Sequence, residues 1–416
     1  MAMFNRWWVV VASIFGLMVG NGPIMQFTFG IFLMPLTQAF GWSRSETSFA
    51  LVAGLTMTAI SVPFAGRLID RFGIRAVTLP SIVLMALCLV GLSTVATTPE
   101  RFVALYALMG IAAAGQTPLP YAKAITSWFD SRRGLALGVA MSGVGLGAAL
   151  MPQVTQFVVN EMSWQAAYLA LAVIMLVVGL PAVALAVKES PKTASNETGA
   201  QSTTSTSPFR LAASFVFKLP VFWLMAFSFF AVALATNGTI AHIVPMLVDR
   251  QIEASVAVGA MAFAGLALIV GRLLAGYLLD RYHAPYVAVA FIALPLAGIS
   301  LMLFAQTPVL AAAAVVLVGM GLGAEVDLIA YLQSRYIGTQ HFGEVYGYFF
   351  TLFMLGSGVG PFVMGLVFDH TGTYSLALAS FCGLLVLSCL ALVRLGEYRF
   401  GTQRHEDKSL TTVGAH

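Results

Sequence analysis

Four charged residues lie within long apolar segments of this sequence, namely Lys123, Arg272, Glu325 and Asp327. A charge at the centre of a membrane-spanning helix costs about 2.5–3.5 kcal/mol, so each one is a candidate functional residue. Arg272 stays protonated and its planar guanidinium matches a carboxylate, which predicts a binding site for an organic anion. Glu325 and Asp327 either exchange a proton in low-dielectric surroundings or form a structural ion pair with Arg272. Lys123 stands near the end of its apolar segment, from which its amine can reach the membrane interface.

The composition indicates that membrane-spanning helices carry these charges. Of the 416 residues, 59% are hydrophobic and 9% are charged, and the mean hydropathy is +0.90. A soluble domain has about 25% charged residues, so a soluble globular protein is excluded. The three cysteines lie in apolar runs, which excludes a disulfide scaffold. The net charge of +4 is spread over many loops, which argues against a nucleic-acid binder.

Twelve apolar segments are long enough to cross a bilayer, which takes about 20 residues. They are residues 8–39, 47–66, 76–99, 102–128, 134–160, 162–187, 219–248, 256–279, 286–307, 308–334, 345–368 and 374–393. The fold class expected is therefore an all-α membrane protein with twelve transmembrane helices. Of the 21 lysines and arginines, 16 fall on the side of both termini and three on the other side. The positive-inside rule then predicts that both termini are cytoplasmic.

A polar stretch divides the twelve segments into six and six. Residues 189–218 are rich in Ser, Thr, Asn and Gly, a composition typical of a disordered linker. The expected organisation is an N-terminal six-helix bundle at 1–188, a cytoplasmic linker at 189–218, a C-terminal six-helix bundle at 219–395 and a cytoplasmic tail at 396–416.

The two halves repeat a short motif at matching positions. Residues 66–73 read Gly-Arg-Leu-Ile-Asp-Arg-Phe-Gly after the second segment, and residues 276–282 read Gly-Tyr-Leu-Leu-Asp-Arg-Tyr after the eighth. The fifth and eleventh segments are both rich in glycine. Two six-helix halves with a substrate site between them near the midplane form a known transporter plan.

Over essentially its whole length the chain resembles the major facilitator superfamily. The run Gly66-x-Leu68-x-Asp70-Arg71-x-Gly73-x-Arg75 matches the signature loop of that family. The resemblance implies two pseudo-symmetric bundles, and it implies that Asp70 and Arg71 tie the halves together in one conformational state. An Asp can cap a neighbouring helix and an Arg can bind carboxylates, which makes that role physically reasonable. The expected gating residues are Gly66, Asp70, Arg71, Gly73, Asp280 and Arg281.

Within that superfamily, the chain resembles the group of monocarboxylate transporters and oxalate/formate antiporters. The resemblance is carried by the junction from Trp128 to Gly143, by Phe29-Gly30-Ile31-Phe32 with the Trp42-Ser43-Arg44 run that follows, and by Gly271-Arg272. It implies transport of a small carboxylate such as lactate, pyruvate, formate or oxalate, bound by Arg272.

Three departures from that group are visible. Its proton-coupled members carry a lysine in the first helix and an aspartate four residues before the arginine, whereas residues 8–39 contain no lysine and Leu268 stands at the second position. The lysine that the oxalate antiporter has in helix 11 is absent from residues 345–368. A clamp of two cations around a dicarboxylate is therefore disfavoured.

The positions along the segments put Arg272 and both acids at a similar depth. Arg272 lies about 24 Å along its segment at about 1.5 Å per residue. Glu325 and Asp327 are two residues apart and point about 200° away from each other, so at most one of them faces the substrate site. Asp327 shares a helix face with Tyr331.

Other polar side chains in the segments are candidates for the same site. Tyr121 offers a phenol that can donate to a carboxylate, and Gln116 lies next to two prolines that predict a kink. Gln26 and Asn237 are mid-segment and either bind substrate or make interhelical hydrogen bonds. His242, near the outer mouth, is either a proton carrier or a packing residue. The full substrate-binding set is Arg272, Tyr121, Gln116, Asn237, Gln26 and Tyr331, with Glu325 and Asp327 as the proton-coupling pair.

These features together predict a secondary active transporter and not an enzyme. Nucleotide-binding, zinc-protease and serine-hydrolase motifs do not occur in the sequence. The expected cargo is a small organic anion, with a monocarboxylate favoured, moved by proton symport or anion exchange. The alternatives are a carrier of a larger or aromatic acid, a proton-antiport exporter and a non-transporting sensor. The expected partners are the anion, protons and membrane lipid, with no nucleic acid, cofactor or metal, for a monomer in a bacterial plasma (inner) membrane.

Overall fold

Every regular element that the structure describes is a helix. The computed structural model describes residues 6–129, 133–187, 212–279, 281–305, 307–338 and 342–398. Within these ranges twelve helices are long and apolar enough to cross a membrane, which confirms the expected fold class. A helix satisfies its backbone hydrogen bonds internally, as hydrocarbon surroundings require.

The first half contains six spans. They are α1 (Trp7–Met18) with η1 (Gly22–Phe27), α3 (Arg44–Phe72), α4 (Ile74–Thr94), α5 (Pro99–Ala113) with η2 (Ala114–Gln116) and α6 (Pro118–Trp128), α7 (Arg133–Glu161), and α8 (Trp164–Ile174) with η3 (Met175–Gly179) and α9 (Leu180–Ala186). A shorter helix, α2 (Phe29–Phe40), continues the first span.

The second half contains the other six spans. They are α11 (Pro220–Asp249), α12 (Ala254–Leu279), α13 (Ala284–Phe304), α14 (Pro308–Tyr336), α15 (Phe342–Thr371) and α16 (Ser375–Val393). The end of the expected linker forms a 3-10 helix, η4 (Ala212–Lys218). Residues 188–211, the rest of that linker, and residues 399–416 of the expected tail lie outside the described residues.

Three spans of the first half are interrupted near proline, the third at η3, which ends just before Leu180-Pro181. The π-helix η1 starts at Gly22-Pro23, and the chain turns out of helical geometry at Thr117, immediately before Pro118. Proline lacks an N–H and its ring clashes with the preceding turn, so it widens or ends a helix. The break at Thr117 confirms the kink predicted beside Gln116.

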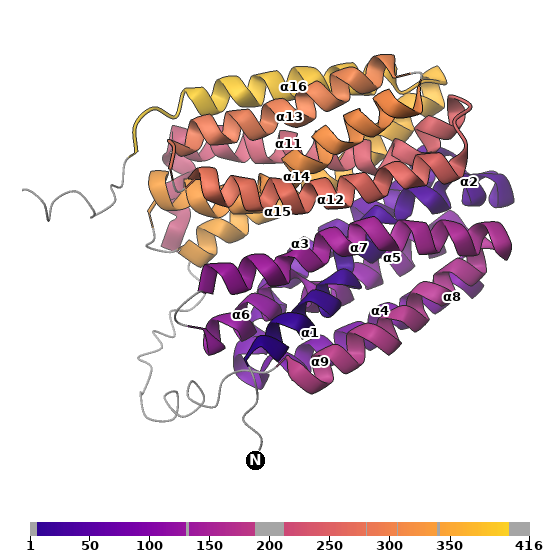
Figure 1. The fold of residues 1–416 in the computed structure, drawn as a ribbon, viewed down its shortest axis with the longest axis horizontal. Coiled ribbons are helices and arrows are strands. Elements are labelled where there is room, and N and C mark those ends of the chain that lie inside the picture. The colour runs from indigo at the N-terminus through magenta and orange to yellow at the C-terminus, as the bar shows by residue number, and fades with distance from the viewer. Residues whose placement is uncertain are drawn as a thin grey trace, which may run out of the picture.

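The halves form two bundles that lie side by side (Figure 1). The bundle of α1 to α9, drawn in indigo to magenta, packs against the bundle of α11 to α16, drawn in red to yellow. Contact between the bundles is carried mainly by α3 against α15 and by α7 against α12. Any site between the halves is therefore lined by these four helices and their neighbours.

The two ends of the molecule differ in how their helices start. We call the end that holds η4 the linker end and the opposite end, where α3 begins and α11 finishes, the far end. Four helices that start at the far end have a side-chain cap, from Ser43, Thr98, Ser163 and Thr307. Such a cap satisfies a backbone N–H that has no partner within the helix. Ser43 also forms a capping box with Glu46, so the start of α3 is fixed especially well.

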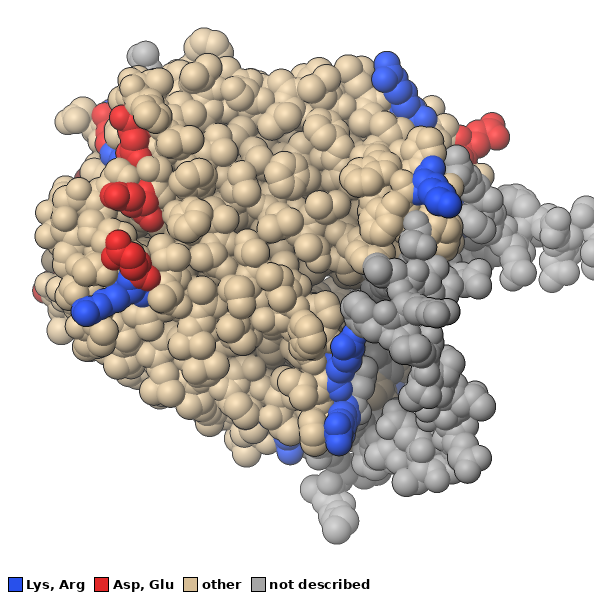
Figure 2. Space-filling view, turned by 180° about the vertical axis from the view of Figure 1, so that it is seen from behind, with Lys and Arg blue, Asp and Glu red and all other residues tan. Residues whose placement is uncertain are grey.

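A wide belt without charged side chains crosses the face of the molecule seen in Figure 2, between its two ends. Figure 2 shows acidic and basic side chains at the far end and mostly basic ones at the linker end, with tan residues between them. Large apolar side chains are exposed on many helices, for example Leu87 on α4, Val173 on α8 and Leu387 on α16. An exposed apolar surface of this extent is stable when lipid covers it.

Glycines let the two bundles approach closely toward the far end. A Cβ on Gly365 of α15 would lie 2.8 Å from the carbonyl carbon of Arg44, and one on Gly358 would lie 3.0 Å from the Cα of Val52. Gly145 of α7 and Gly265 of α12 touch in the same way, each against the other's backbone. Small residues at such crossings are typical of helix contacts in membranes.

Replacing Gly110 with alanine should lower the thermal unfolding temperature by several degrees. Its Cβ would meet the carbonyl of Gly54 and lie 2.9 Å from the Gly54 Cα, so α5 and α3 would have to separate. Overpacking of this kind costs about 1–3 kcal/mol. A matched control is Gly383→Ala on α16, where a Cβ meets nothing within 4 Å and the helix should keep or gain stability. Equal unfolding temperatures for the two purified variants would contradict the close approach of α3 and α5.

Candidate functional site

Arg272 and Asp327 lie together between α12 and α14. The guanidinium Nε of Arg272 is 3.3 Å from the carbonyl oxygen of Gly323 and 3.4 Å from Oδ2 of Asp327. Glycine makes this possible, since a Cβ on Gly323 would lie 2.8 Å from the backbone nitrogen of Arg272. The structure therefore favours Asp327 over Glu325 as the acid beside the arginine.

The pair leaves much of the arginine's binding capacity unused. Its contacts to Gly323 and Asp327 both go through Nε, and Nη1 and Nη2 make no hydrogen bond or ion pair with any residue that the structure describes. The side chain of Arg272 is 14% exposed and that of Asp327 is 43% exposed. Two adjacent N–H groups of a guanidinium can bind both oxygens of one carboxylate, so Arg272 is able to accept an anion without losing its present contacts.

A tyrosine on α15 completes this cluster. The phenol of Tyr346 lies close enough to Asp327 and Arg272 for both charges to act on it, and its ring is 5.8 Å from the ring of Phe350. The sequence did not single out Tyr346, because an aromatic residue in an apolar helix is usually a packing residue. Its position next to Gly347 in the glycine-rich eleventh segment is the only signal that the sequence offered.

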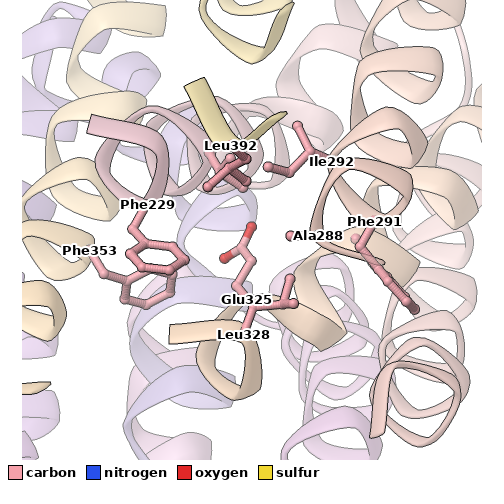
Figure 3. A pocket seen from close by; sticks show the side chains of 10 residues that line it. Phe229, Ala288, Phe291, Ile292, Glu325, Leu328, Phe353 and Leu392 are labelled. Carbon is pink, nitrogen blue, oxygen red and sulfur yellow. The ribbon is translucent and has the colours of Figure 1, made fainter. Parts of the chain in front are cut away.

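Glu325 points away from Arg272 into the interior of the second bundle. Figure 3 shows its carboxyl group in a pocket formed by apolar side chains, among them Phe229, Phe353 and Leu392. The cavity has a volume of about 20 Å³, which is enough for one water molecule. The residue is 5% exposed and its Oε2 has no hydrogen-bond partner.

The hydroxyl of Thr236 has two acceptors within reach, Glu325 and the backbone of its own helix. Thr236 Oγ1 lies 2.7 Å from Glu325 Oε1 and 2.8 Å from the carbonyl oxygen of Val232. The threonine hydroxyl has one proton, and the carbonyl can only accept. Both contacts are full hydrogen bonds when Glu325 donates to Thr236 and Thr236 donates to Val232. Asn237 adjoins this chain, since its Nδ2 lies 3.5 Å from Thr236 Oγ1 and 3.1 Å from the carbonyl of Ala233.

The polar candidates in the first bundle are not gathered at Arg272. Tyr121 is fully buried against Gly16 of α1, and its hydroxyl has no hydrogen-bond partner. Gln116 is also buried and donates to the carbonyl of Ser81 on α4 at 3.0 Å. Gln26 is half-buried in η1 and forms no hydrogen bond with another described side chain. None of these three residues forms a hydrogen bond with Arg272 or Asp327 in the described structure.

Tyr331, Lys123 and the expected gating residues lie toward the linker end. The hydroxyl of Tyr331 accepts from Arg335 at 3.2 Å, and Lys123 is half-buried in α6. The guanidinium of Arg71 lies 5.1 Å from the ring centre of its neighbour Phe72, and that of Arg281 lies 3.6 Å from the ring of Tyr277. Each of these last contacts stays within one half of the molecule.

The remaining gating candidates are glycines, whose role concerns the backbone, or acids that lie outside the described residues. Gly73 has a φ of +83° at the end of α3, a conformation that favours glycine. A Cβ on Gly66 would meet Leu119 at an ordinary 3.5 Å. The side chain of Asp70 and the whole of Asp280 lie outside the described part of the chain.

A second charged cluster joins the two bundles at the far end. Arg44 binds Asp249 through both terminal nitrogens, at 2.6 and 2.9 Å, and it also donates to the hydroxyl of Tyr374. The backbone nitrogens of Arg44 and Ser45 donate to the carboxylate of Asp369, at 3.0 and 2.8 Å. Arg44 and Ser45 belong to the first half and the three partners to the second, so this far-end cluster closes that end of the molecule.

The sequence alone did not reveal the far-end cluster. In the sequence, Arg44 is one of the three basic residues on the side opposite both termini. Its partners are about 205 to 330 positions away in the chain, and no local spacing reports such a contact. Its place in the Trp42-Ser43-Arg44 run was the one indication that it matters.

Comparisons with known proteins agree on one family. A model of the Major Facilitator Superfamily matches residues 9–361. An uncharacterized MFS-type transporter, YcxA of Bacillus subtilis (strain 168), is 25% identical over 390 residues, which cover 89% of this chain and 91% of that protein. Human monocarboxylate transporter 11 is 26% identical over 403 residues, covering 92% of this chain and 81% of that protein.

The fold is also shared with a solved transporter. The crystal structure of the nucleoside transporter NupG superimposes with a TM-score of 0.75 and 15% sequence identity, covering 94% of this chain and all of that chain. At this identity the likeness concerns the fold alone.

Proposed function

Because this chain belongs to the Major Facilitator Superfamily and is a transporter rather than an enzyme, we propose that it moves a small organic anion, in the first place a monocarboxylate, bound by Arg272. The observation that carries the proposal is that Nη1 and Nη2 of Arg272 bind no residue that the structure describes, next to a partly exposed acid. The likeness to human monocarboxylate transporter 11 supports the same class of substrate. One cation favours a single carboxylate over a dicarboxylate.

The ion pair suggests how a proton accompanies the anion. While Asp327 is ionised it neutralises Arg272 and repels an incoming carboxylate. A proton on Asp327 removes that repulsion and leaves the charge of Arg272 to the substrate. Binding one proton and one anion then leaves the net charge of the site unchanged, which avoids the cost of an unpaired charge in the membrane. We therefore favour symport of one proton per carboxylate, with anion exchange as the alternative.

Glu325 is a second proton-binding residue in this scheme, apart from the anion. It reaches the region of Asn237 through Thr236, and its pocket has room for one water molecule. A proton held there would be shielded from Arg272 by the body of α14. Tyr346 is proposed as a substrate contact in place of Tyr121, because it lies at the Arg272 cluster.

The linker end is proposed to face the cytoplasm, since most lysines and arginines lie there. The far-end cluster then closes the outer side, so the conformation described is one in which the anion site is reached from the cytoplasm. Alternating access would require that cluster to open, while the Asp70 and Arg71 loop closes the linker end.

Uptake into proteoliposomes tests the proposal. We expect saturable uptake of radiolabelled lactate, pyruvate or formate that rises when the outside is made more acidic. In Asp327→Asn the dependence on the proton gradient should fall by about tenfold or more, since the amide cannot take part in proton exchange, while anion exchange without a gradient continues. Glu325→Gln should likewise weaken accumulation.

A matched control is Glu161→Gln, at an exposed acid on the far end. It should behave as the unsubstituted protein does. Proton stimulation that persists in both Asp327→Asn and Glu325→Gln would exclude the coupling scheme. Absence of both uptake and exchange for every carboxylate tested would exclude the proposed substrate class.

A further inference from the structure

His242 on α11 is buried at the centre of the contacts that close the far end. Its Nε2 lies 2.9 Å from the carbonyl oxygen of Pro361 and 3.2 Å from Oγ of Ser48, and its Nδ1 lies 3.2 Å from the hydroxyl of Tyr374. Ser48 comes from the first half, whereas Pro361 and Tyr374 come from the second. The imidazole thus links the bundles a little deeper than Arg44 does, and the anion site makes no use of it.

The partners of His242 determine which nitrogen carries the proton. The Pro361 carbonyl can only accept, so Nε2 must be protonated. Nδ1 of the neutral imidazole then accepts from the hydroxyl of Tyr374, whose oxygen in turn accepts from Arg44. The result is a chain of three hydrogen bonds that run in one direction. Arg44 donates to Tyr374, Tyr374 donates to His242, and His242 donates to the carbonyl of Pro361. That chain is complete only with a neutral histidine.

A proton on Nδ1 would reverse the middle of this chain. The Tyr374 oxygen would face two cationic donors, His242 and Arg44, and its own proton would have no acceptor. Arg44 cannot lose its charge to relieve the conflict. The other charged groups near the imidazole are Asp369 on α15 and Asp249 at the end of α11, and both carboxylates are already held by Arg44 or the start of α3. Helix α2, which also packs on α11, contains no titratable residue.

We propose that His242 is a proton sensor that controls the far end: the neutral imidazole holds that end closed, and protonation favours its opening. An imidazole that becomes exposed to water when the bundles separate titrates near its ordinary pKa of about 6.5. Protons therefore bind the open form in preference to the closed form and shift the population toward it, by up to about tenfold per pH unit. The inference concerns when the far end opens and requires no substrate, so it goes beyond the proposed function.

Distances between spin labels test the inference. Labels on Asn160→Cys of α7 and Ser255→Cys of α12 would report the far end, because both residues are exposed there and belong to different halves. The chain would be labelled after replacement of Cys88, Cys382 and Cys389, in lipid nanodiscs without substrate. We expect the fraction with a long distance to rise at least about threefold between pH 7.5 and pH 5.5.

Two variants separate His242 from the other titratable groups. His242→Gln keeps one donor and one acceptor but cannot be protonated, so its open fraction should change less than about 1.5-fold over the same range. His370→Gln removes an exposed histidine at the end of α15 and should respond as the parent chain does. An open fraction that does not change with pH in the parent chain, or that changes equally in His242→Gln, would overturn the proposal. If the glutamine variant does not fold, a parent chain whose open fraction stays constant with pH still overturns the proposal.

Discussion

Replacing Arg272 with alanine should reduce carboxylate binding and uptake by about 30-fold or more. Removing one member of a buried, hydrogen-bonded charge pair costs about 2–5 kcal/mol, and each 1.4 kcal/mol is about a factor of ten. In this variant the carboxylate would have no cation, and Asp327 would repel it. Thermal-shift titration of the purified protein with monocarboxylates measures the binding, because a ligand of the native state raises the unfolding temperature with its concentration.

The lysine variant makes the same test more specific. Arg272→Lys keeps the charge and loses the planar fork, so it should bind more weakly than the parent chain and more strongly than the alanine variant. Arg101→Ala is the matched control, since Arg101 is exposed at the far end and its guanidinium donates to Thr97, one helical turn away. An alanine variant at position 272 that retains a parent-like thermal shift and uptake would disprove the proposed site.

Replacing Gly265 with valine should stop the transport cycle at a stage in which the far end cannot close. A Cβ at this position would meet backbone atoms of α7, lying 2.9 Å from the carbonyl carbon of Ala148 and still nearer to Ala149 and Gly145. Backbone atoms cannot move aside as a flexible side chain can, so α12 and α7 must separate. Because both bundles keep their own cores, we expect a folded protein whose uptake falls at least about tenfold while the spin-label distance at the far end becomes longer.

Gly259→Val on the same helix is the matched control. A Cβ there meets nothing within 4 Å, so the substitution adds the same side chain without touching α7. Uptake should then remain close to that of the parent chain. Parent-like transport by the Gly265 variant would show that close packing of α7 on α12 is not needed in any step.

The spans were predictable because hydrocarbon imposes a length and a composition on each helix. Apolar segments such as 256–279 and 286–307 coincide with α12 and α13 to within a few residues. The depth of Arg272 and the opposite directions of Glu325 and Asp327 also follow from helix geometry alone, and the structure supplies which acid meets the arginine. That choice depends on how α12 and α14 cross at Gly323, which no local pattern encodes.

The rest of the candidate site depended on contacts between segments far apart in the chain. Gln116 and Tyr121 had the right chemistry at the right depth, but their helices turn these side chains toward α4 and α1. Tyr346 and Arg44 had only a weak local signal, from the residues beside them in the sequence, and acquire their importance from partners in another helix. Periodicity identifies a buried face of a helix but does not identify the neighbour that it faces.

The caps at the far end have a consequence for what is lost when the two halves separate. The starts of α3, α5, α8 and α14 are each completed by a serine or threonine of their own loop, so none of those four caps is lost when water enters between the halves. Among these four helix starts, that of α3 also donates backbone N–H groups to a carboxylate of the other half, that of Asp369. Separation of the halves would therefore break the polar contacts around Arg44 and leave the four side-chain caps intact.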